Sequence, residues 1–291
     1  MSSTSSPRHN TIPDFATLTQ ARDIALEAAG RAASFIQAQR GRPEAQDIQD
    51  KGLNDFATFV DEGAQQLIIA SIRSAFSDHA ILAEEGFEDS SRSLADIDGW
   101  LWIIDPLDGT TNFLHGIPHY GVSIGLQHNG TTVLGVVRDV CRGETFHAIR
   151  GAGAFQDGLP CHVSKAARLS DSLITTGFPY KQFDYLDGYT DCIRRFWQDS
   201  RGVRRPGSAS LDLAWVACGR FEGFFEQGLM PWDVSAGALI VEEAGGRYTD
   251  FYGRSPGPDS STLGSEIVAS NALIHDEMIA RLGPLRHPDA V

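Results

Sequence analysis

Residues 105–113 carry the side chains with the clearest capacity for chemistry. They read Asp-Pro-Leu-Asp-Gly-Thr-Thr-Asn-Phe and follow directly on an apolar run at residues 100–104. Such a run before a turn signal is typical of a buried strand, and we expect it to stop at Pro106, which has no backbone donor. Ligands collect at strand ends in open α/β sheets. Carboxylates and a backbone carbonyl are the ligands that Mg²⁺ prefers, so the segment predicts a magnesium site.

Three further acidic stations stand at the borders of predicted elements. Asp61 precedes an amphipathic run at residues 62–76, and Asp233 precedes a second helical pattern. Glu84 and Glu85 end a short apolar segment. Each station has an ordinary alternative, because aspartates cap helices, paired glutamates often form a solvated surface, and Asp-Pro or Asp-Gly pairs mark plain turns. Their joint occurrence favours a shared site over a set of unrelated turns and caps.

Together these stations resemble one family, the inositol monophosphatases, and in particular its bacterial extragenic-suppressor branch. The resemblance covers residues 21–282 and is most specific at residues 105–113 and 232–246. The stretch at residues 51–61 and the paired glutamates are weaker alone but fall in the right order. Ala83 stands where family members more often carry Gly. A small residue is retained there, and we infer no loss of activity from it.

The resemblance implies a site for two or three Mg²⁺ ions. By that mapping, Glu84, Asp105 and the Leu107 carbonyl hold the first ion, and a third, weaker ion lies near Glu84. The second ion is held by Asp105, Asp108 and Asp233. A phosphate monoester is dianionic, and two ions roughly 4 Å apart can hold its attacking and leaving oxygens. Carboxylates without His or Cys favour Mg²⁺ over Zn²⁺.

The resemblance also assigns the proton transfer of the reaction. Asp61 polarises the Thr110 hydroxyl, which accepts a proton from the attacking water, and direct general-base chemistry needs only that geometry. Glu84 belongs to the same catalytic group. Lys51 and Glu85 are expected to be auxiliary, with Lys51 lending positive charge near the site; its alternative is a plain surface lysine.

Substrate contacts are assigned to a wider set of residues. Backbone N–H groups after Gly109 open a short predicted helix, which is a natural phosphate cradle. By resemblance, Glu226 accepts hydrogen bonds from ring hydroxyls beside the backbone of Ala209; its alternative is a surface charge at a strand end. Buried acceptors that need donors let a site reject analogues lacking a hydroxyl. The expected substrate contacts are Asp108, Gly109, Thr110, Thr111, Ala209, Glu226 and Asp233.

The activity implied by the resemblance is Mg²⁺-dependent hydrolysis of a phosphate monoester, inhibited by Li⁺. Inositol 1-phosphate is the favoured substrate, and its hydrolysis releases myo-inositol and phosphate. Sister families that share the metal motifs act on histidinol phosphate, fructose 1,6-bisphosphate and 3′-phosphoadenosine 5′-phosphate. The resemblance further implies a homodimer.

A regulatory binding protein is the second class of function, because relatives in the bacterial branch also contact the transcription machinery and antitermination factors. A basic cluster in an otherwise acidic chain could serve such binding; its alternative is a solvated or dimer-contact face. The cluster consists of Arg194, Arg195, Arg201, Arg204 and Arg205.

Composition narrows the remaining possibilities. The chain has 24 Lys and Arg against 38 Asp and Glu, a net charge of −14, which disfavours broad electrostatic binding of nucleic acid. No apolar stretch approaches a membrane span, and residues 1–13 are rich in Ser and Thr, so we expect a disordered tail without a signal peptide. The 4 cysteines lack paired metal spacing, which fits reduced thiols in a cytoplasmic protein.

The order of predicted elements indicates an α/β fold. A helix is expected at residues 17–39, and Asn129-Gly130 is a hairpin signal between strands at 120–127 and 131–138. A further strand is expected at 144–149, before a Gly-rich connection. The later predicted strands are 173–176, 202–205, 221–226 and 267–270, and the later predicted helices are 185–197, 211–218, 234–244 and 272–282.

The resemblance implies that these elements form a layered α-β-α-β-α sandwich with the metal site between its halves. We expect residues 14–285 to form a single catalytic domain, with an N-terminal half to about residue 150 and a C-terminal half from about residue 151. Residues 250–265, rich in Gly, Pro and Ser, are expected to be a surface loop.

Overall fold

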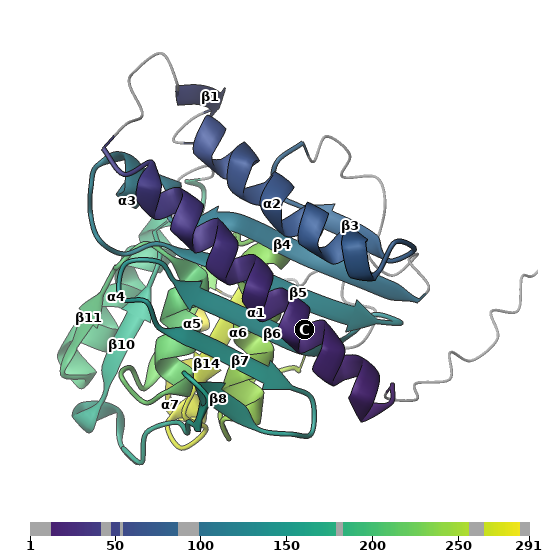
Figure 1. Ribbon diagram of the computed structural model, residues 1–291. Helices are drawn as coiled ribbons and strands as arrows, with labels where there is room; N and C mark the ends of the chain where they lie inside the picture. The colour runs from purple at the N-terminus through teal and green to yellow at the C-terminus, as the bar shows by residue number, and fades with distance from the viewer. Residues whose placement is uncertain are drawn as a thin grey trace, which may run out of the picture.

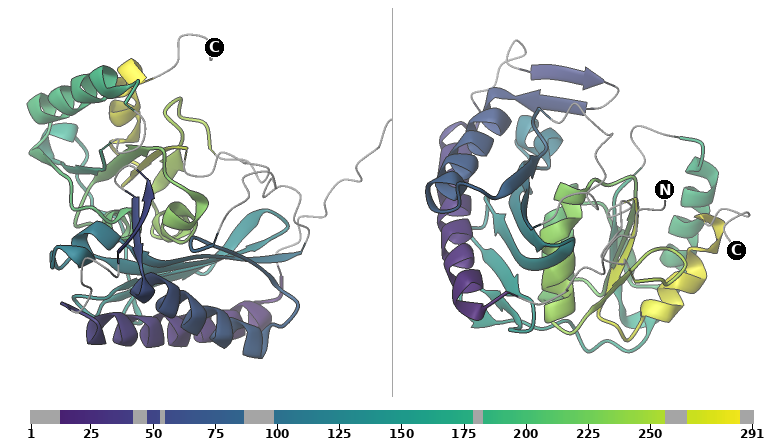
Figure 2. Two further views of the ribbon diagram at one scale, coloured as in Figure 1. Left: turned by 90° about the horizontal axis from the view of Figure 1, so that it is seen from above. Right: turned by 90° about the vertical axis from the view of Figure 1, so that its right-hand side faces the viewer.

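Helices and sheets alternate in the order α-β-α-β-α, as the expected sandwich requires (Figures 1 and 2). The computed structural model describes residues 13–41, 48–52, 55–86, 99–178, 183–255 and 265–285, so the expected disordered tail lies outside it except for Pro13. The three helix layers are, in order, α1 (Phe15–Ala38) with α2 (Phe59–Ala75), α5 (Ala209–Ala217) with α6 (Pro231–Glu243), and α4 (Leu186–Asp199) with α7 (His275–Arg281).

The first sheet lies between the outer pair α1 and α2 and the central pair α5 and α6. Its first two strands run parallel and the others pair antiparallel. The predicted hairpin is confirmed, since Asn129 and Gly130 both have positive φ, 50° and 79°. The strand order is β3 (Ala80–Ala83), β4 (Trp100–Asp108), β5 (Gly121–His128), β6 (Thr131–Asp139), β7 (Thr145–Ile149), β8 (Ala154–Gln156) and β9 (Leu159–Pro160).

The second sheet separates the central helices from α4 and α7. β10 pairs in parallel with two neighbours, while β14 pairs antiparallel. The order is β11 (Gly202–Arg204), β10 (Leu173–Thr176), β12 (Gly223–Gln227), β14 (Glu266–Ser270) and β13 (Arg247–Thr249). A separate ribbon joins β1 (Ile48–Gly52) to β2 (Asp55–Thr58).

The apolar strands are buried on both faces, as their continuous hydrophobic runs predict. In β4, Trp102 and Ile104 pack with α1 and α2, whereas Leu101 and Ile103 pack with Trp232 on the opposite face. In β12, the neighbours Phe224 and Phe225 likewise belong to separate cores on the two sides of the second sheet. Both sheets are therefore packed on both faces.

Several expected boundaries were wrong. β4 does not stop at Pro106. Its pairing with β5 is irregular between Asp105 and Asp108 and then resumes, so the proline interrupts the pairing locally without ending the strand. The expected Gly-rich connection at residues 151–158 contains β8, β9 follows it directly, and neither these two strands nor β13 was predicted. In the expected surface loop, Phe251 is fully buried among α4, α7 and the second sheet.

Two further observations bear on composition. All four cysteines are free thiols. Within the ranges described above, no helix combines the length and the apolar character needed to cross a membrane.

Candidate active site

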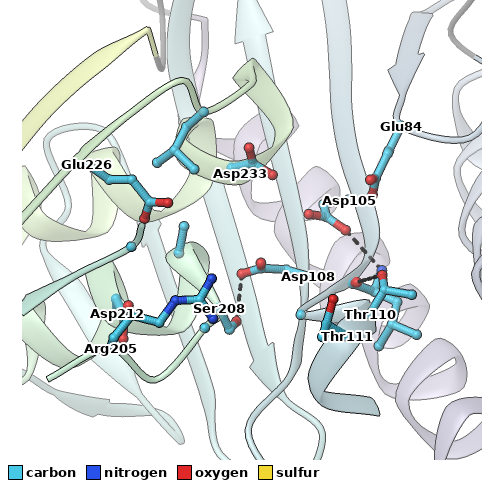
Figure 3. A pocket seen from close by; sticks show the side chains of 16 residues that line it. Glu84, Asp105, Asp108, Thr110, Thr111, Arg205, Ser208, Asp212, Glu226 and Asp233 are labelled. Atoms are coloured by element: carbon cyan, nitrogen blue, oxygen red, sulfur yellow. Dashed lines mark hydrogen bonds between the residues drawn. The ribbon is translucent and has the colours of Figure 1, made fainter. Parts of the chain in front are cut away.

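A cavity of about 330 Å³ opens where the first sheet meets α5, α6 and the second sheet (Figure 3). It gathers most of the predicted site from positions far apart in the chain. The predicted residues that line it are Glu84, Asp105, Leu107, Asp108, Gly109, Thr110, Thr111, Ala209, Glu226 and Asp233.

A cluster of carboxylates forms the centre of the cavity. Asp105, Asp108 and Asp233 each present an oxygen, and these oxygens lie within 4.8 Å of one another. Glu84 points toward Asp105 from the first sheet (Figure 3). Burial raises the pKa of Asp105 well above its ordinary value, and the charges of the other three carboxylates raise it further. So much buried negative charge is unfavourable without a cation, and oxygen ligands alone suit Mg²⁺.

Local backbone geometry brings the first-sheet carboxylates together. The Glu84 N–H donates to the Ile104 carbonyl at 3.1 Å, which extends the parallel pairing of β3 and places Glu84 beside the end of β4. Around Pro106 the chain turns locally, and the Leu107 N–H donates to Asp105 Oδ1 at 3.0 Å. The strand irregularity thus lets both aspartates of β4 face the cavity.

Asp108 is held from across the cavity by the start of α5. Its Oδ2 accepts the Ser208 hydroxyl at 2.6 Å, the Ser210 N–H at 2.7 Å and the Ser210 hydroxyl at 2.5 Å. These bonds fix one carboxylate oxygen and leave Oδ1 for a cation. Sequence reasoning did not find either serine, because nothing in residues 206–210 indicates which carboxylate they contact.

Asp61 combines a helix cap with a contact to the site. Thr58, not Asp61, is the N-cap of α2, and its N–H and hydroxyl donate to Asp61 Oδ2 at 2.9 and 2.6 Å. The Thr110 hydroxyl lies 3.0 Å from Asp61 Oδ1 and 3.0 Å from the Leu107 carbonyl, and its one proton can go to either. Burial raises the pKa of Asp61, while hydrogen bonds from Thr58 and Thr110 oppose the rise.

Asp233 has the equivalent position in α6, whose N-cap is Met230. It lies in the first turn, and its Oδ2 accepts the Met230 N–H at 2.7 Å. The cap alternatives for Asp61 and Asp233 are therefore partly right, since both residues complete capping boxes at the third helical position. The other oxygen of Asp61 accepts from Thr110, and Asp233 belongs to the carboxylate cluster.

The turn into α3 (Thr110–Leu114) requires glycine. Gly109 has φ of 96°, and a Cβ there would lie 3.0 Å from the Gly207 carbonyl. Asn112 then ties this turn to the segment before α5: its amide nitrogen donates to the carbonyls of His119 at 2.7 Å and Pro206 at 2.8 Å. Sequence reasoning passed over Asn112, although it belongs to the predicted metal segment.

The wall opposite Thr110 contains Glu226, which is only 7% exposed. Burial raises its pKa well above the ordinary value, Asp212 adds to the rise and Arg205 opposes it. A Cβ on Gly177 would lie 1.8 Å from Glu226 Oε1, so the carboxylate occupies space that only glycine leaves. The alternative of an exposed strand-end charge is wrong for Glu226.

Asp212 also lines the cavity and was not predicted. Its Oδ1 and His119 Nε2 are buried 3.8 Å apart, and among the described residues neither atom has a hydrogen-bond partner. The distance would suit an ion pair, but burial lowers the pKa of His119 and keeps the imidazole neutral near pH 7. Burial also raises the pKa of Asp212 well above its ordinary value, with the charge of Asp108 as the second cause.

The two predicted auxiliary residues lie in different parts of the fold. Lys51 lies in β1, and its side chain is outside the described atoms. Glu85 does not line the cavity; its backbone exchanges two hydrogen bonds with the side chain of Gln65, at 2.8 and 3.0 Å.

The predicted basic cluster does not form one free positive surface. Arg194 and Arg195 pair with Asp191, and Arg201 lies 3.5 Å from Asp171. Arg205 faces the cavity instead of the surface cluster (Figure 3).

Comparisons with known proteins identify the family of this chain. A model of the inositol monophosphatase family matches residues 17–284. Nus factor SuhB of Pseudomonas aeruginosa is 46% identical over 234 residues, which cover 79% of this chain and 85% of that protein.

Two solved structures show the same similarity. The extragenic suppressor protein SuhB of Bartonella henselae has a TM-score of 0.81 at 36% identity and covers 91% of this chain and 98% of its own. Inositol monophosphatase from Anabaena has a TM-score of 0.75 at 35% identity, with coverage of 91% and 96%. This chain therefore belongs to the inositol monophosphatase family.

Proposed function

We propose that the protein is a Mg²⁺-dependent phosphatase whose substrate is inositol 1-phosphate. The observation that carries this proposal is the buried carboxylate cluster beside the Asp61–Thr110 hydrogen bond. Family membership supports a phosphatase. On this proposal, the cavity would offer oxygen ligands for a cation, the Thr110 hydroxyl backed by Asp61 for an attacking water, and Glu226 for ring hydroxyls.

The carboxylate cluster would hold the cations in the arrangement that the family resemblance implies. Glu84, Asp105 and the Leu107 carbonyl would hold one ion. Asp105, Asp108 and Asp233 would hold a second. When bound, Mg²⁺ supplies neutralisation of the phosphate charge and acidification of water.

The chain's own residues supply the proton transfer and part of the phosphate binding. Thr110 hands its hydroxyl proton toward Asp61 as it accepts one from the attacking water, and burial makes Asp61 a stronger base than an exposed aspartate. The backbone after Gly109 faces the cavity and would contact phosphate oxygens.

A polyol fits the opposite wall better than an apolar alcohol does. Glu226 is buried in the wall of the cavity that Ala209 also lines. An unpaired buried acceptor is unfavourable, so ligand hydroxyls that donate to Glu226 would be selected. The names of solved relatives include inositol monophosphatase, which supports inositol 1-phosphate over the phosphates of the sister families.

A substrate panel at saturating Mg²⁺ tests the proposal. The panel contains inositol 1-phosphate, histidinol phosphate, fructose 1,6-bisphosphate and 3′-phosphoadenosine 5′-phosphate. We expect the highest kcat/KM for inositol 1-phosphate and inhibition by Li⁺. A higher value for another member would reassign the substrate, and hydrolysis that persists in EDTA would contradict the metal dependence.

A regulatory role is a second candidate, favoured by one observation: the relative from Pseudomonas aeruginosa is named a Nus factor. We propose that such a role would be independent of turnover. Affinity capture of antitermination factors and RNA polymerase by wild type and by a catalytically inactive variant would test it. Capture by neither form would leave catalysis as the proposed function. The homodimer and the cytoplasmic location are also proposals; sedimentation and cell fractionation test them.

A further inference from the structure

Among the described residues that line the cavity, Arg205 is the one with a basic side chain. It stands between β11 and α5, and Figure 3 shows its guanidinium directed toward the space between Glu226 and Asp108. The guanidinium lies 5.7 Å from the centre of the Phe178 ring, a cation–π contact that limits its freedom. Its neighbour Arg204 instead bonds the Val203 carbonyl at 3.1 Å and does not line the cavity.

Two buried carboxyl groups lie near Arg205 without contacting it. Its positive charge acts on both Glu226 and Asp212, opposing the effect of burial on each. Nevertheless, within the described residues Arg205 makes no ion pair shorter than 4.0 Å. The Arg205 guanidinium is therefore separated from these carboxyl groups by a gap that opens into the cavity. A ligand atom in this gap can bridge the guanidinium and a carboxyl group.

The charged groups on either side of this gap determine which kind of ligand group can occupy it. A second anionic group would meet Arg205 but would also face two buried carboxyls, so it is disfavoured. A hydroxyl group suits both sides, since it donates its proton to a carboxylate and accepts from a guanidinium N–H. Two neighbouring hydroxyls on one ring could use the fork of Arg205 and both oxygens of Glu226.

We propose that Arg205 is a specificity-determining residue that reads, together with Glu226, neighbouring hydroxyl groups on the substrate ring. This inference rests on the proposed phosphatase function and names the group that would give it selectivity for polyols. Lys is a poor replacement, because its ammonium lacks the planar fork and the stacking surface.

Kinetics on a matched pair of substrates test the proposal. Cyclohexyl phosphate keeps the six-membered ring of inositol 1-phosphate and lacks every ring hydroxyl. We expect Arg205→Ala to lower kcat/KM for inositol 1-phosphate at least about tenfold more than for cyclohexyl phosphate, the loss typical of hydrogen bonds to a charged group. Arg205→Lys should recover little of this selectivity, and Arg204→Ala, the matched control, should keep it.

A double variant tests whether Arg205 and Glu226 read the same hydroxyls. If they do, Arg205→Ala combined with Glu226→Gln should lose less selectivity than the product of the two single losses. Equal losses on both substrates would overturn the proposal and assign Arg205 to phosphate attraction or to assembly. Sedimentation of each variant separates those two explanations.

Product binding separates this inference from the proposed function. Calorimetric titration of myo-inositol into protein with Mg²⁺ and inorganic phosphate involves no turnover, and cyclohexanol is the control ligand. If the protein fails to hydrolyse phosphate monoesters but binds myo-inositol at least about tenfold more weakly in Arg205→Ala, the function fails and the inference stands. Hydrolysis without this dependence leaves the function and overturns the inference. Absence of myo-inositol binding by wild type overturns the inference as well.

Discussion

Single residues in this site serve the fold and the chemistry with different atoms. Asp61 Oδ2 completes the cap of α2, while Oδ1 receives the Thr110 hydroxyl. Asp108 Oδ2 is saturated by serine donors, so only Oδ1 remains for a cation. Because the two oxygens of one carboxylate are divided in this way, conservative substitutions can separate their roles.

Thr110 tests the proposed base. We expect Thr110→Ala to lower kcat by about 10²–10⁴-fold, the range typical of lost general-base catalysis, with smaller changes in KM and in Mg²⁺ dependence. Thr110→Ser keeps the hydroxyl and should keep most of the activity. Steady-state kinetics on inositol 1-phosphate decide: if Thr110→Ala is nearly as active as wild type, Asp61 is a helix cap only, and Asp61→Asn should then cost little kcat.

Asp108 tests the cation site. Asp108→Asn should abolish turnover, because its amide cannot replace a negative ligand oxygen, while the melting temperature without metal stays the same or rises as repulsion among carboxylates falls. Mg²⁺ should raise the melting temperature of wild type much more than that of the variant. Activity within about tenfold of wild type would contradict the ligand role.

Asp212 gives a prediction about pH. Burial raises the pKa of this carboxyl, so the folded protein binds the proton more tightly than the unfolded chain does. Stability contributed by this group is present at low pH and is lost as pH rises from about 4 through the raised pKa.

The variant Asp212→Asn removes that dependence. It should therefore gain stability over wild type, by roughly a few degrees in melting temperature, most at pH 8 and least near pH 4. Thermal melts across this range measure it. Asp276→Asn is the control, because its side chain is 90% exposed and should show no such trend. A gain that is independent of pH would mean that packing, not ionisation, explains the effect.

At the scale of elements, periodicity predicted most helices and strands but not the interruptions. The apolar run before Asp105 indicated β4 correctly, yet the ladder resumes after Pro106 because β4 has one extra residue there: Asp105 pairs with Ser123 and Asp108 with Gly121. Strands β8, β9 and β13 are three residues or fewer, too short to show an alternating pattern. The carboxylates of the proposed metal site could be predicted from their motif, whereas Ser208, Asn112 and Asp212 act through contacts between distant elements that no local pattern encodes.

The close approach of β10 and β12 gives a prediction at this scale. Gly177 follows β10, and a side chain there would displace the Glu226 carboxylate. Gly177→Ala should thus reproduce Glu226→Gln: weaker discrimination between inositol 1-phosphate and β-glycerophosphate, with metal affinity nearly unchanged. Kinetics on both substrates and Mg²⁺ titrations check it. Equal loss on both substrates for Glu226→Gln would indicate that Glu226 supports the metals instead.

At the scale of the whole molecule, the site depends on the layers being stacked as a unit. The carboxylate cluster comes from the first sheet and from α6, and Glu226, which we propose selects hydroxyl groups, comes from the second sheet. The core between the sheets contains Val137 and Phe146 from the N-terminal half beside Leu211 and Phe224 from the other half. The expectation of a single catalytic domain over residues 14–285 stays a prediction.

Metal removal should therefore affect the molecule globally. Cations held between β4 and α6 would join the two halves, so we expect EDTA to abolish activity and to lower the melting temperature in one cooperative transition. At a concentration of 100 Kd, a ligand stabilises the folded state by about 2.7 kcal/mol. Calorimetry with and without Mg²⁺ measures the shift. A melting temperature that is insensitive to both EDTA and Mg²⁺ would contradict a cation at this position.

The side-chain amide of Asn112 fixes the spacing between two segments of the cavity wall. It holds the turn after Gly109 against the segment that precedes Ala209. Neither segment can then move without the other, so on the proposed function the distance between the bound phosphorus and the recognised hydroxyls would be set before any substrate binds. The cavity would then select substrates by the distance between the phosphate ester and the hydroxyl groups. A substrate in which this distance differs would bind poorly even if it carried the same groups.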